Sequence, residues 1–431
     1  MKILTLFLLL FTYFLSIESD YLLQPINGIN GYVQAIEFNL DGNAYVAVLK
    51  ATEDLESYRQ LYKLRSPTEI LWVVNITDSV TKIIINSFND VYLEHTTADN
   101  YESYLSVLKE DPVTIKKIDD IYEFSMFIDG DDNIIYNSNE GIKLLRPKST
   151  TPILIKNLEN RYFLDDASFA TDSKGNLYLG VLDFEGSTAS LEVVSNEAKQ
   201  EEIPYVTAQF FFESEYFVDC LIVNENDEVW VFLSDFTTSQ ILKLTDGNMT
   251  HFQNDELYEN HRGLAVKDRV YVISISYNIS ASAYFLTSNN EVHKISEING
   301  VVAHSFSTIE LAADKDGNTY IGAFVAFENG PVALMKPESE NTTMITFPRL
   351  INVESLVVDD NDDLWVVTGG DGGVYYLKKG ETAAVKVLNH RGAATDLIGT
   401  AFVNKKTNEV FLPGSTHLYT IVNNTAWLLD F

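Results

Sequence analysis

Residues 352–377 read NVESLVVDDNDDLWVVTGGDGGVYYL, and this stretch decides the fold. It contains an apolar strand, a turn of Asp and Asn residues, a second strand that opens with an aromatic residue, a glycine-rich turn and a third strand. Side chains alternate with a period of two, which is typical of β-strands and not of helices. Asp, Asn and Gly tolerate the backbone angles of tight turns. The stretch therefore predicts a unit of short strands joined by hairpin turns.

The same pattern recurs along the whole chain and predicts an all-β repeat fold. Nine copies are anchored by aromatic residues, namely Tyr45, Tyr92, Tyr136, Tyr178, Trp230, Tyr271, Tyr320, Trp365 and Phe411. Their mean spacing of about 46 residues is that of four-stranded propeller blades. We therefore predict one β-propeller over residues 20–431, with about nine repeat units and eight or nine blades. The second and ninth copies are the weakest, and residues 21–23 are expected to pair with the last blade.

Alignment of the first strands supports this prediction. One column is wholly apolar and consists of Ile36, Ile83, Met126, Phe169, Leu221, Leu264, Leu311, Leu356 and Ala401. The column before it is mostly small and consists of Ala35, Lys82, Ser125, Ser168, Cys220, Gly263, Glu310, Ser355 and Thr400. Adjacent residues of a strand point in opposite directions. We expect the apolar column to pack between blades and the small column to line a central channel.

The first residues have the pattern of a secretory signal peptide. Lys2 is followed by an apolar stretch at residues 3–15 and by polar residues up to Ser19. We predict a signal peptide at residues 1–19, with a signal anchor as the alternative. Five glycosylation sequons accompany it, at Asn75, Asn248, Asn278, Asn341 and Asn423. The expected product is a secreted glycoprotein.

Composition excludes several classes of function. The chain has 62 acidic and 30 basic residues and a net charge of −32, without a basic block. It is therefore a poor candidate for binding nucleic acid or inserting into a membrane. Its one cysteine, Cys220, excludes an intrachain disulfide and a cysteine-built zinc site. We expect Cys220 to be a buried, inert thiol.

The repeat resembles known propeller families. Its order of strand, Asp/Asn/Gly turn and aromatic strand is similar to that of NHL and gluconolactonase/regucalcin-type propellers. Residues 120–145 (DIYEFSMFIDGDDNIIYNSNEGIKLL) and 352–377 resemble secreted insect ommochrome-binding proteins, which carry small pigments. The second resemblance implies an organic ligand. The first implies acidic and Asn side chains at the channel mouth that hold a divalent metal and polarise a lactone.

Charged residues on the first strands are the candidate ligand contacts. Lys82 and Glu310 interrupt the small column, and the column before it carries Asp219, Arg262 and Glu354. His261 belongs to an Asn-His-Arg-Gly sequence that recurs at residues 389–392. The predicted ligand-binding set is Lys82, Asp219, His261, Arg262, Glu310 and Glu354. A solvated channel with paired charges is the alternative, and Asp219, Glu310 and Glu354 are the carboxylates that a metal-dependent hydrolase would use.

The acidic turns raise the question of calcium. Asp129, Asp131, Asn133 and Glu140 match positions 1, 3, 5 and 12 of a calcium loop, but Ile134 stands at position 6, which requires glycine. This excludes an EF-hand. We interpret these turns as hairpins and keep calcium as the alternative.

These patterns lead to one preferred function and two alternatives. We expect a secreted, non-enzymatic propeller that binds a small organic ligand, such as an aromatic or pigment-like molecule, in an extracellular fluid. A metal-dependent lactonase-type hydrolase and an extracellular protein-interaction module of venom, saliva or body fluid are the alternatives. No cofactor is expected, although a divalent cation stays possible.

Overall fold

A computed structural model defines the fold of most of the chain. It describes residues 21–51, 57–97, 102–122, 126–157, 168–183, 188–212, 216–234, 239–252, 261–275, 281–287, 289, 291–295, 308–324, 332–337, 339, 341–348, 353–368, 373–389, 400–414 and 417–423. The predicted signal peptide and Asn278 lie outside the described residues. Within these ranges no helix is long and apolar enough to cross a membrane.

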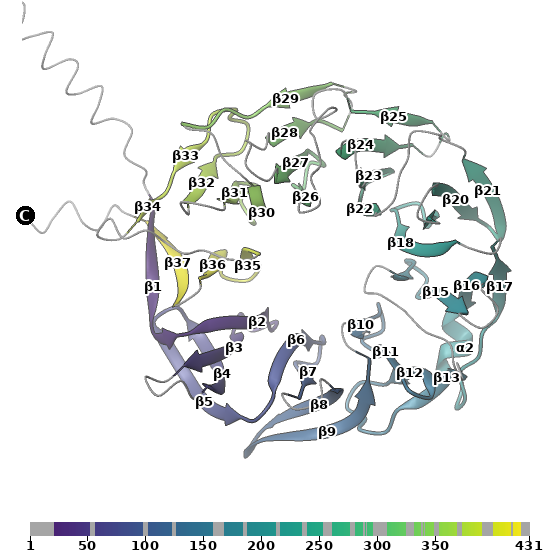
Figure 1. The fold of residues 1–431 in the computed structure, drawn as a ribbon, viewed down its shortest axis with the longest axis horizontal. Coiled ribbons are helices and arrows are strands. Elements are labelled where there is room, and N and C mark those ends of the chain that lie inside the picture. The colour runs from purple at the N-terminus through teal and green to yellow at the C-terminus, as the bar shows by residue number, and fades with distance from the viewer. Residues whose placement is uncertain are drawn as a thin grey trace, which may run out of the picture. The chain divides into compact units, whose positions relative to one another are not determined.

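The described residues form nine sheets, which are the blades of a β-propeller (Figure 1). The predicted all-β fold class with nine units is therefore confirmed. Neighbouring strands run antiparallel, apart from the parallel pair β1 and β34. The blades fall into two compact units. In blades 1 to 8 the first strand along the chain lies on the inner side of the blade and the fourth strand lies on its outer side (Figure 1).

One unit comprises Val33–Ser307 with Glu338–Asn341 and holds blades 1 to 6. Blade 1 consists of β2 (Tyr32–Phe38), β3 (Ala44–Ala51), β4 (Ser57–Ser66) and β5 (Glu69–Ile76), and blade 2 of β6 (Ser79–Ile85), β7 (Val91–Thr96), β8 (Ser103–Glu110) and β9 (Val113–Ile121). Blade 3 consists of β10 (Met126–Ile128), β11 (Ile134–Ser138), β12 (Gly141–Leu145) and β13 (Ile153–Asn157), and blade 4 of β14 (Phe169–Thr171), β15 (Leu177–Asp183), β16 (Thr188–Val194) and β17 (Ala208–Phe211). Blade 5 consists of β18 (Phe217–Val223), β19 (Val229–Ser234), β20 (Ser239–Thr245) and β21 (Asn248–Phe252), and blade 6 of β22 (His261–Val266), β23 (Arg269–Ile275), β24 (Ala281–Leu286) and β25 (Val292–Lys294).

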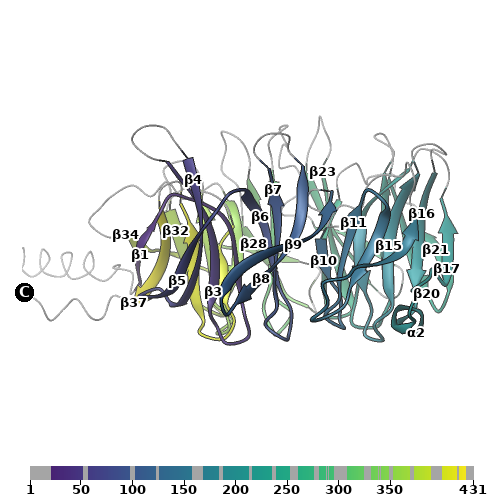
Figure 2. The ribbon, with the colours of Figure 1, turned by 90° about the horizontal axis from the view of Figure 1, so that it is seen from below.

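A short helix, α2 (Asn196–Gln200), follows β16 and lies at the lower end of these sheets in Figure 2.

The other unit comprises Met1–Tyr32, Thr308–Pro337 and Thr342–Phe431 and holds blades 7 to 9. Blade 7 consists of β26 (Thr308–Ala313), β27 (Thr319–Phe324), β28 (Val332–Met335) and β29 (Thr342–Met344), and blade 8 of β30 (Val353–Val358), β31 (Leu364–Thr368), β32 (Gly373–Leu377) and β33 (Val385–Lys386). Blade 9 has the order β34 (Leu388–Asn389), β1 (Tyr21–Asn30), β37 (His417–Asn423), β36 (Glu409–Pro413) and β35 (Phe402–Asn404). Because β1 pairs with β37, with Leu22 opposite Val422, the predicted pairing of residues 21–23 with the last blade is confirmed.

An Asn or Asp side chain shapes the turn after the first strand of eight blades. In blade 4, Asp172 Oδ1 accepts hydrogen bonds from the N–H groups of Lys174 (3.1 Å) and Asn176 (2.8 Å). Such a side chain satisfies amides that the turn would otherwise leave unpaired. The turns begin at Asn39, Asn86, Asp129, Asp172, Asn224, Asp314, Asp359 and Asn404. The interpretation of the acidic stretches as hairpin turns is confirmed.

The turns of successive blades are also bonded to one another. The residue with positive φ in the turn is Gly, Asn or Asp in eight blades. Where it is Asn or Asp, its side-chain oxygen accepts the N–H of the preceding blade's turn. The bonds run from Leu40 to Asn89 (3.2 Å), Ser87 to Asp132 (2.8 Å), Ser173 to Asp227 (2.7 Å), Lys315 to Asp362 (3.0 Å) and Asp360 to Asn408 (2.7 Å). These turn-to-turn bonds link neighbouring blades at one end of the strands.

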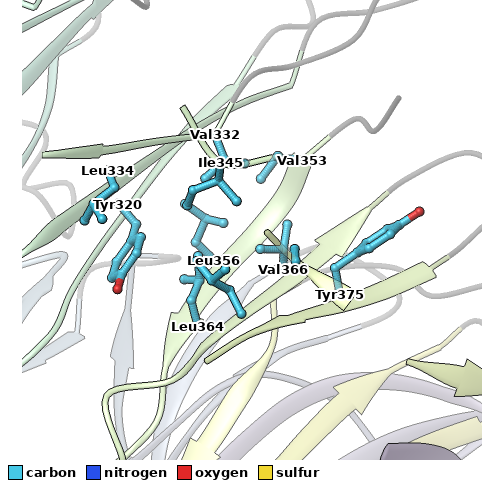
Figure 3. Close-up of a cluster of buried hydrophobic side chains, with 11 residues drawn as sticks. Tyr320, Val332, Leu334, Ile345, Val353, Leu356, Leu364, Val366 and Tyr375 are labelled. Atoms are coloured by element: carbon cyan, nitrogen blue, oxygen red, sulfur yellow. The ribbon is translucent and has the colours of Figure 1, made fainter. Parts of the chain in front are cut away.

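The apolar column packs between blades, as predicted. Seven of its members are buried: Ile36, Ile83, Met126, Phe169, Leu221, Leu356 and Ala401. Figure 3 shows one such interface, where Leu356 of β30 lies among side chains of blades 7 and 8. Tyr320 and Val353 belong to the same cluster. Burial of apolar area of this kind is the main source of stability.

The alignment was wrong by one residue in blade 6. In blade 5 the column residue Leu221 pairs with Val231, the residue after the aromatic Trp230. In blade 6 the predicted column residue Leu264 pairs with the aromatic Tyr271 itself. Gly263 therefore stands where Leu221 stands in blade 5. A Cβ built on Gly263 would come within 2.1 Å of Ile222 Cδ1, so this face of β22 is directed at blade 5. The cause is the shorter turn between β22 and β23, in which Val266 pairs with Arg269.

The small column does not line a channel at the members whose contacts are defined. Ser168, Cys220 and Ser355 are buried. Ser168 Oγ donates to the carbonyl oxygen of Val218 in the next blade (3.2 Å), and Ser355 Oγ accepts the N–H of Ala401 in the next blade (3.1 Å). Both faces of a blade pack on neighbouring blades, so small side chains are required for close approach and not for an open channel. The prediction of an inert, buried Cys220 agrees with its place in the core between blades 5 and 6.

Candidate functional site

Two predicted site residues occupy the same special backbone position. The pairing of β30 with β31 passes from Val353 to Ser355 and leaves out Glu354. The pairing of β18 with β19 leaves out Asp219 in the same way. Each residue is therefore the extra residue of a β-bulge in the first strand of its blade. Bulges change the direction of a side chain and are frequent beside functional sites.

A third bulge lies at Thr81 of β6, where the pairing passes from Val80 to Lys82. The Thr81 hydroxyl is close to Glu94, with Oγ1 at 3.2 Å from Glu94 Oε1. Asp219 is half-buried. Of these three bulges, the one in blade 8 carries a glutamate, Glu354.

Glu354 has the properties expected of a ligand-binding carboxylate. Its side chain is half-buried on the innermost strand of blade 8. Its Oε2 atom is buried and has no hydrogen-bond partner among the described residues. Removal from water raises the pKa of the carboxyl group above its ordinary value. A buried carboxylate oxygen without a donor is costly, and a ligand that supplies a donor would remove this cost.

Glu310 lies on the first strand of the preceding blade. It pairs with Gly322 in blade 7 and is half-buried. Side chains alternate along β26, and Ala312, two residues on, packs in the cluster that blade 7 shares with blade 8. Glu310 is therefore on the face of β26 that is directed at the blade of Glu354.

Lys82 stands at the equivalent position in blade 2 and is used within the fold. Its Nζ donates to the carbonyl oxygen of Met126 in the first strand of blade 3, at 2.7 Å. This bond ties two neighbouring inner strands. It resembles the bonds of Ser168 and Ser355 to their next blades.

Blade 6 carries the remaining predicted residues, and the corrected register changes their positions. His261 pairs with Ser274 and Arg262 with Ile273. Both His261 and Val218 pair with the third residue after the aromatic residue of the second strand, so His261 stands at the level of Val218. The continuous pairing of His261–Val266 contains no extra residue equivalent to Asp219. The side chains of His261 and Arg262 lie outside the described part of the structure, as does most of the second Asn-His-Arg-Gly sequence.

A buried polar cluster in blade 2 escaped the sequence analysis. Glu94 and Ser106 are fully buried, and His95 is almost so. His95 Nε2 lies 2.7 Å from Ser106 Oγ, and its ring stacks on Tyr104 at 4.6 Å between centroids. Burial lowers the pKa of His95 to about 4, so the ring is neutral at pH 7. Their buried positions exclude contact with a substrate and assign them to the blade interior.

The acidic turn of blade 3 is neutralised by a lysine. Lys199 of α2 is fully buried and its Nζ lies 2.7 Å from Asp129 Oδ2 and 2.8 Å from Asp131 Oδ2. Asn133 also donates to Asp129. An ammonium group thus stands at the carboxylates that suggested calcium. Among the described residues, no group of three His, Cys, Asp or Glu side chains could hold a metal ion.

Comparisons with known proteins concern the fold alone. No protein-family model and no curated protein sequence matches the chain. It is similar to the β-propeller domain of the Trilobed protease from Pyrococcus furiosus, at 10% identity over 85% of this chain and 100% of that one, with a TM-score of 0.42. It is also similar to virginiamycin B lyase from Staphylococcus aureus, at 8% identity over 93% of this chain and 99% of that one, with a TM-score of 0.41.

A third likeness is to a structure from a study of two prolyl endopeptidases, at 10% identity with a TM-score of 0.47. It covers 92% of this chain and 55% of the other. With TM-scores below 0.5, these likenesses say nothing about what this chain binds. No family match supports the resemblance to NHL or ommochrome-binding proteins, which stays a hypothesis.

Proposed function

We propose that the chain is a secreted, non-enzymatic propeller that binds a small organic ligand at the inner strands of blades 7 and 8. The observation that carries the proposal is Glu354, a half-buried carboxylate on a bulge, because no residue in the described part of the chain forms a hydrogen bond with its buried Oε2. Glu310, on the face of β26 directed at blade 8, is the second contact. Asp219, His261, Arg262 and Lys82 stay hypotheses as ligand contacts.

The chemistry of Glu354 indicates the ligand class. A carboxylate accepts hydrogen bonds, so the ligand must donate one, as an amine or a phenol does. Donation by a charged amine is stronger than donation by a neutral group. The net charge of −32 also favours cationic ligands by raising their concentration near the protein. An aromatic amine or a phenolic amine therefore fits best.

Binding of tyramine tests the proposal, because tyramine carries both an amine and a phenol. Isothermal titration should show binding to the secreted protein and weaker or no binding of 3-(4-hydroxyphenyl)propionate, which replaces the amine with a carboxylate. Glu354→Gln should weaken tyramine binding at least tenfold, since a hydrogen bond to a charged group contributes about 1.5–3 kcal/mol. Glu381→Gln removes the same charge from an exposed turn of blade 8 and is the matched control.

Equal affinity of the Glu354→Gln variant and the unaltered protein would contradict the proposed site. Hydrolysis of a lactone that a chelator abolishes would favour the metal-dependent hydrolase instead. A protein that co-purifies in stoichiometric amount from the native fluid, with no tyramine binding, would favour the interaction module.

A further inference from the structure

We infer that N-linked oligosaccharides at Asn75, Asn248 and Asn341 cover the outer edges of blades 1, 5 and 7 and prevent the propeller from pairing edge to edge with a second copy. Asn75 lies in β5, Asn248 begins β21, and Asn341 directly precedes β29. Each of these strands is the outermost of its four-stranded sheet. Three sequons far apart in the sequence thus lie in or directly beside an outermost strand.

The side chains at these positions are open to modification. All three are exposed. Asn75 Oδ1 accepts a hydrogen bond from Gln60 Nε2 at 2.9 Å, which leaves Nδ2, the atom that carries a glycan, directed away from this bond. Asn248 Nδ2 has only a long contact of 3.4 Å with the carbonyl oxygen of Asp246. Asn341 is held through its backbone, whose N–H donates to Ser339 Oγ at 3.0 Å.

The outer edges are where a propeller blade needs protection. An outermost strand presents unpaired N–H and C=O groups to any extended chain that approaches. On the strands that carry sequons, large apolar side chains are exposed beside these groups: Ile70 and Val73 in β5 and Met344 in β29. The outermost strand of blade 2, β9, has no sequon but exposes Lys116, Lys117 and Asp120. Charged side chains protect the edge of blade 2, and a hydrophilic glycan would protect the edges that expose Ile70, Val73 and Met344.

The modification is an ordinary group transfer of the secretory pathway. A lipid-linked oligosaccharide, bound to a polyprenyl diphosphate, supplies the glycan. A bond forms between Asn Nδ2 and C1 of the first sugar, the bond from C1 to the phosphate oxygen breaks, and the amide loses one proton. The inference rests on secretion, which is part of the proposed function, but not on the ligand.

The test is a glycan map of the full chain secreted by insect cells. Release of the glycans by peptide-N-glycosidase in ¹⁸O water should mark all three asparagines by mass spectrometry. A triple variant, Thr77→Ala, Thr250→Ala and Thr343→Ala, removes the sequons and keeps the asparagines. It should lose one glycan mass at each site and form dimers or larger species in light scattering after size-exclusion chromatography. Asn157→Gln, at an exposed outermost-strand asparagine outside any sequon, should stay monomeric.

Unmodified asparagines in the secreted protein would overturn the inference. So would a triple variant that lacks the glycans but stays monomeric at high protein concentration, because the edges would then need no cover. Retention of the unaltered chain inside the cells would overturn secretion and this inference together. Failure of tyramine to bind would contradict the ligand proposal and leave the glycan map as it is.

Discussion

Replacement of Lys199 by methionine should destabilise blades 3 and 4 by about 3 kcal/mol. Lys199 and Asp129 are fully buried as an ion pair, and loss of one partner of such a pair costs about 3–5 kcal/mol because the other charge is left without compensation. Asp131, the second partner, is one-third exposed, so water screens its share and the lower value applies. Methionine has a similar length and leaves little empty space.

Hydrogen exchange at single amides is the suitable measurement. The N–H groups of Asp131 and Asn133 both donate to Asp129 Oδ1 at 2.9 Å, so they report directly on this turn. A repeat protein opens locally, and a loss of about 3 kcal/mol lowers protection by about 100-fold. Lys174→Met removes an exposed lysine from the neighbouring turn of blade 4 and should leave protection unchanged.

A double variant separates loss of charge balance from loss of packing. Asn39, Asn86 and Asn224 shape the equivalent turns of other blades, so Asp129→Asn keeps the turn and removes the buried charge. Lys199→Met with Asp129→Asn should recover most of the protection that Lys199→Met loses. Normal protection in the single variant, or no recovery in the double variant, would refute the reasoning.

Two further predictions follow from buried and turn residues. The pKa of His95 lies at about 4 in the folded state against 6.5 in the unfolded chain, so the contribution of the neutral ring to stability is complete above pH 6.5 and falls by about 3 kcal/mol as the pH drops to 4. His95→Gln should flatten this part of the curve of unfolding free energy against pH, and an unchanged curve would contradict the prediction. Asp132→Gly keeps a residue suited to the φ of 65° and loses the bonds to Ser87, which should lower the free energy of unfolding by about 1.5 kcal/mol. Asp132→Ala should lower it by about 1 kcal/mol more, because alanine is strained at this φ. Equal midpoints of urea unfolding for the two variants would be inconsistent with that strain.

The repeat and its turns could be predicted because they are encoded locally. In seven blades the turn has an Asn or Asp at its start and a Gly, Asn or Asp three residues later, and both choices follow from backbone geometry. The turn-to-turn bonds were missed, although the sequence carries a signal for them. Gly would suffice for a positive φ, so the Asp at 132, 227 and 362 indicates a second task, which is to bind the turn of the preceding blade.

The register in blade 6 could not be derived from residue types alone. Leu264 and Gly263 both fit a first strand, and only the length of the turn at Lys267 distinguishes the two alignments. Blade 3 shows a related limit. Tyr136 pairs with Met126, as Leu93 pairs with Ile83 in blade 2, so this aromatic lies on the opposite face from Tyr92. An aromatic anchor marks a strand but does not fix which face it occupies.

Two of the predicted site residues differ in how the neighbouring blade satisfies their polar groups. Lys82 and Glu354 both attracted attention because they interrupt a regular column. The next blade accounts for Lys82, whose ammonium binds the Met126 carbonyl oxygen. Nothing in the described structure donates to the buried Oε2 of Glu354. The bulges that position Glu354 and Asp219 have no common residue type, since Thr81 occupies the third.

A charged residue on an inner strand is therefore not in itself an indication of a site. Neighbouring blades within a unit pack face to face, and polar side chains such as Ser168 and Ser355 form hydrogen bonds that join them. What distinguishes Glu354 is that its desolvated Oε2 has no donor among the described residues while its side chain stays half-buried on an inner strand. Burial of a polar atom without a partner lowers the stability of the fold, and the fold nevertheless keeps such an atom at Glu354. A ligand donor would recover that loss, which is why the tyramine experiment is directed at this carboxylate and not at Lys82.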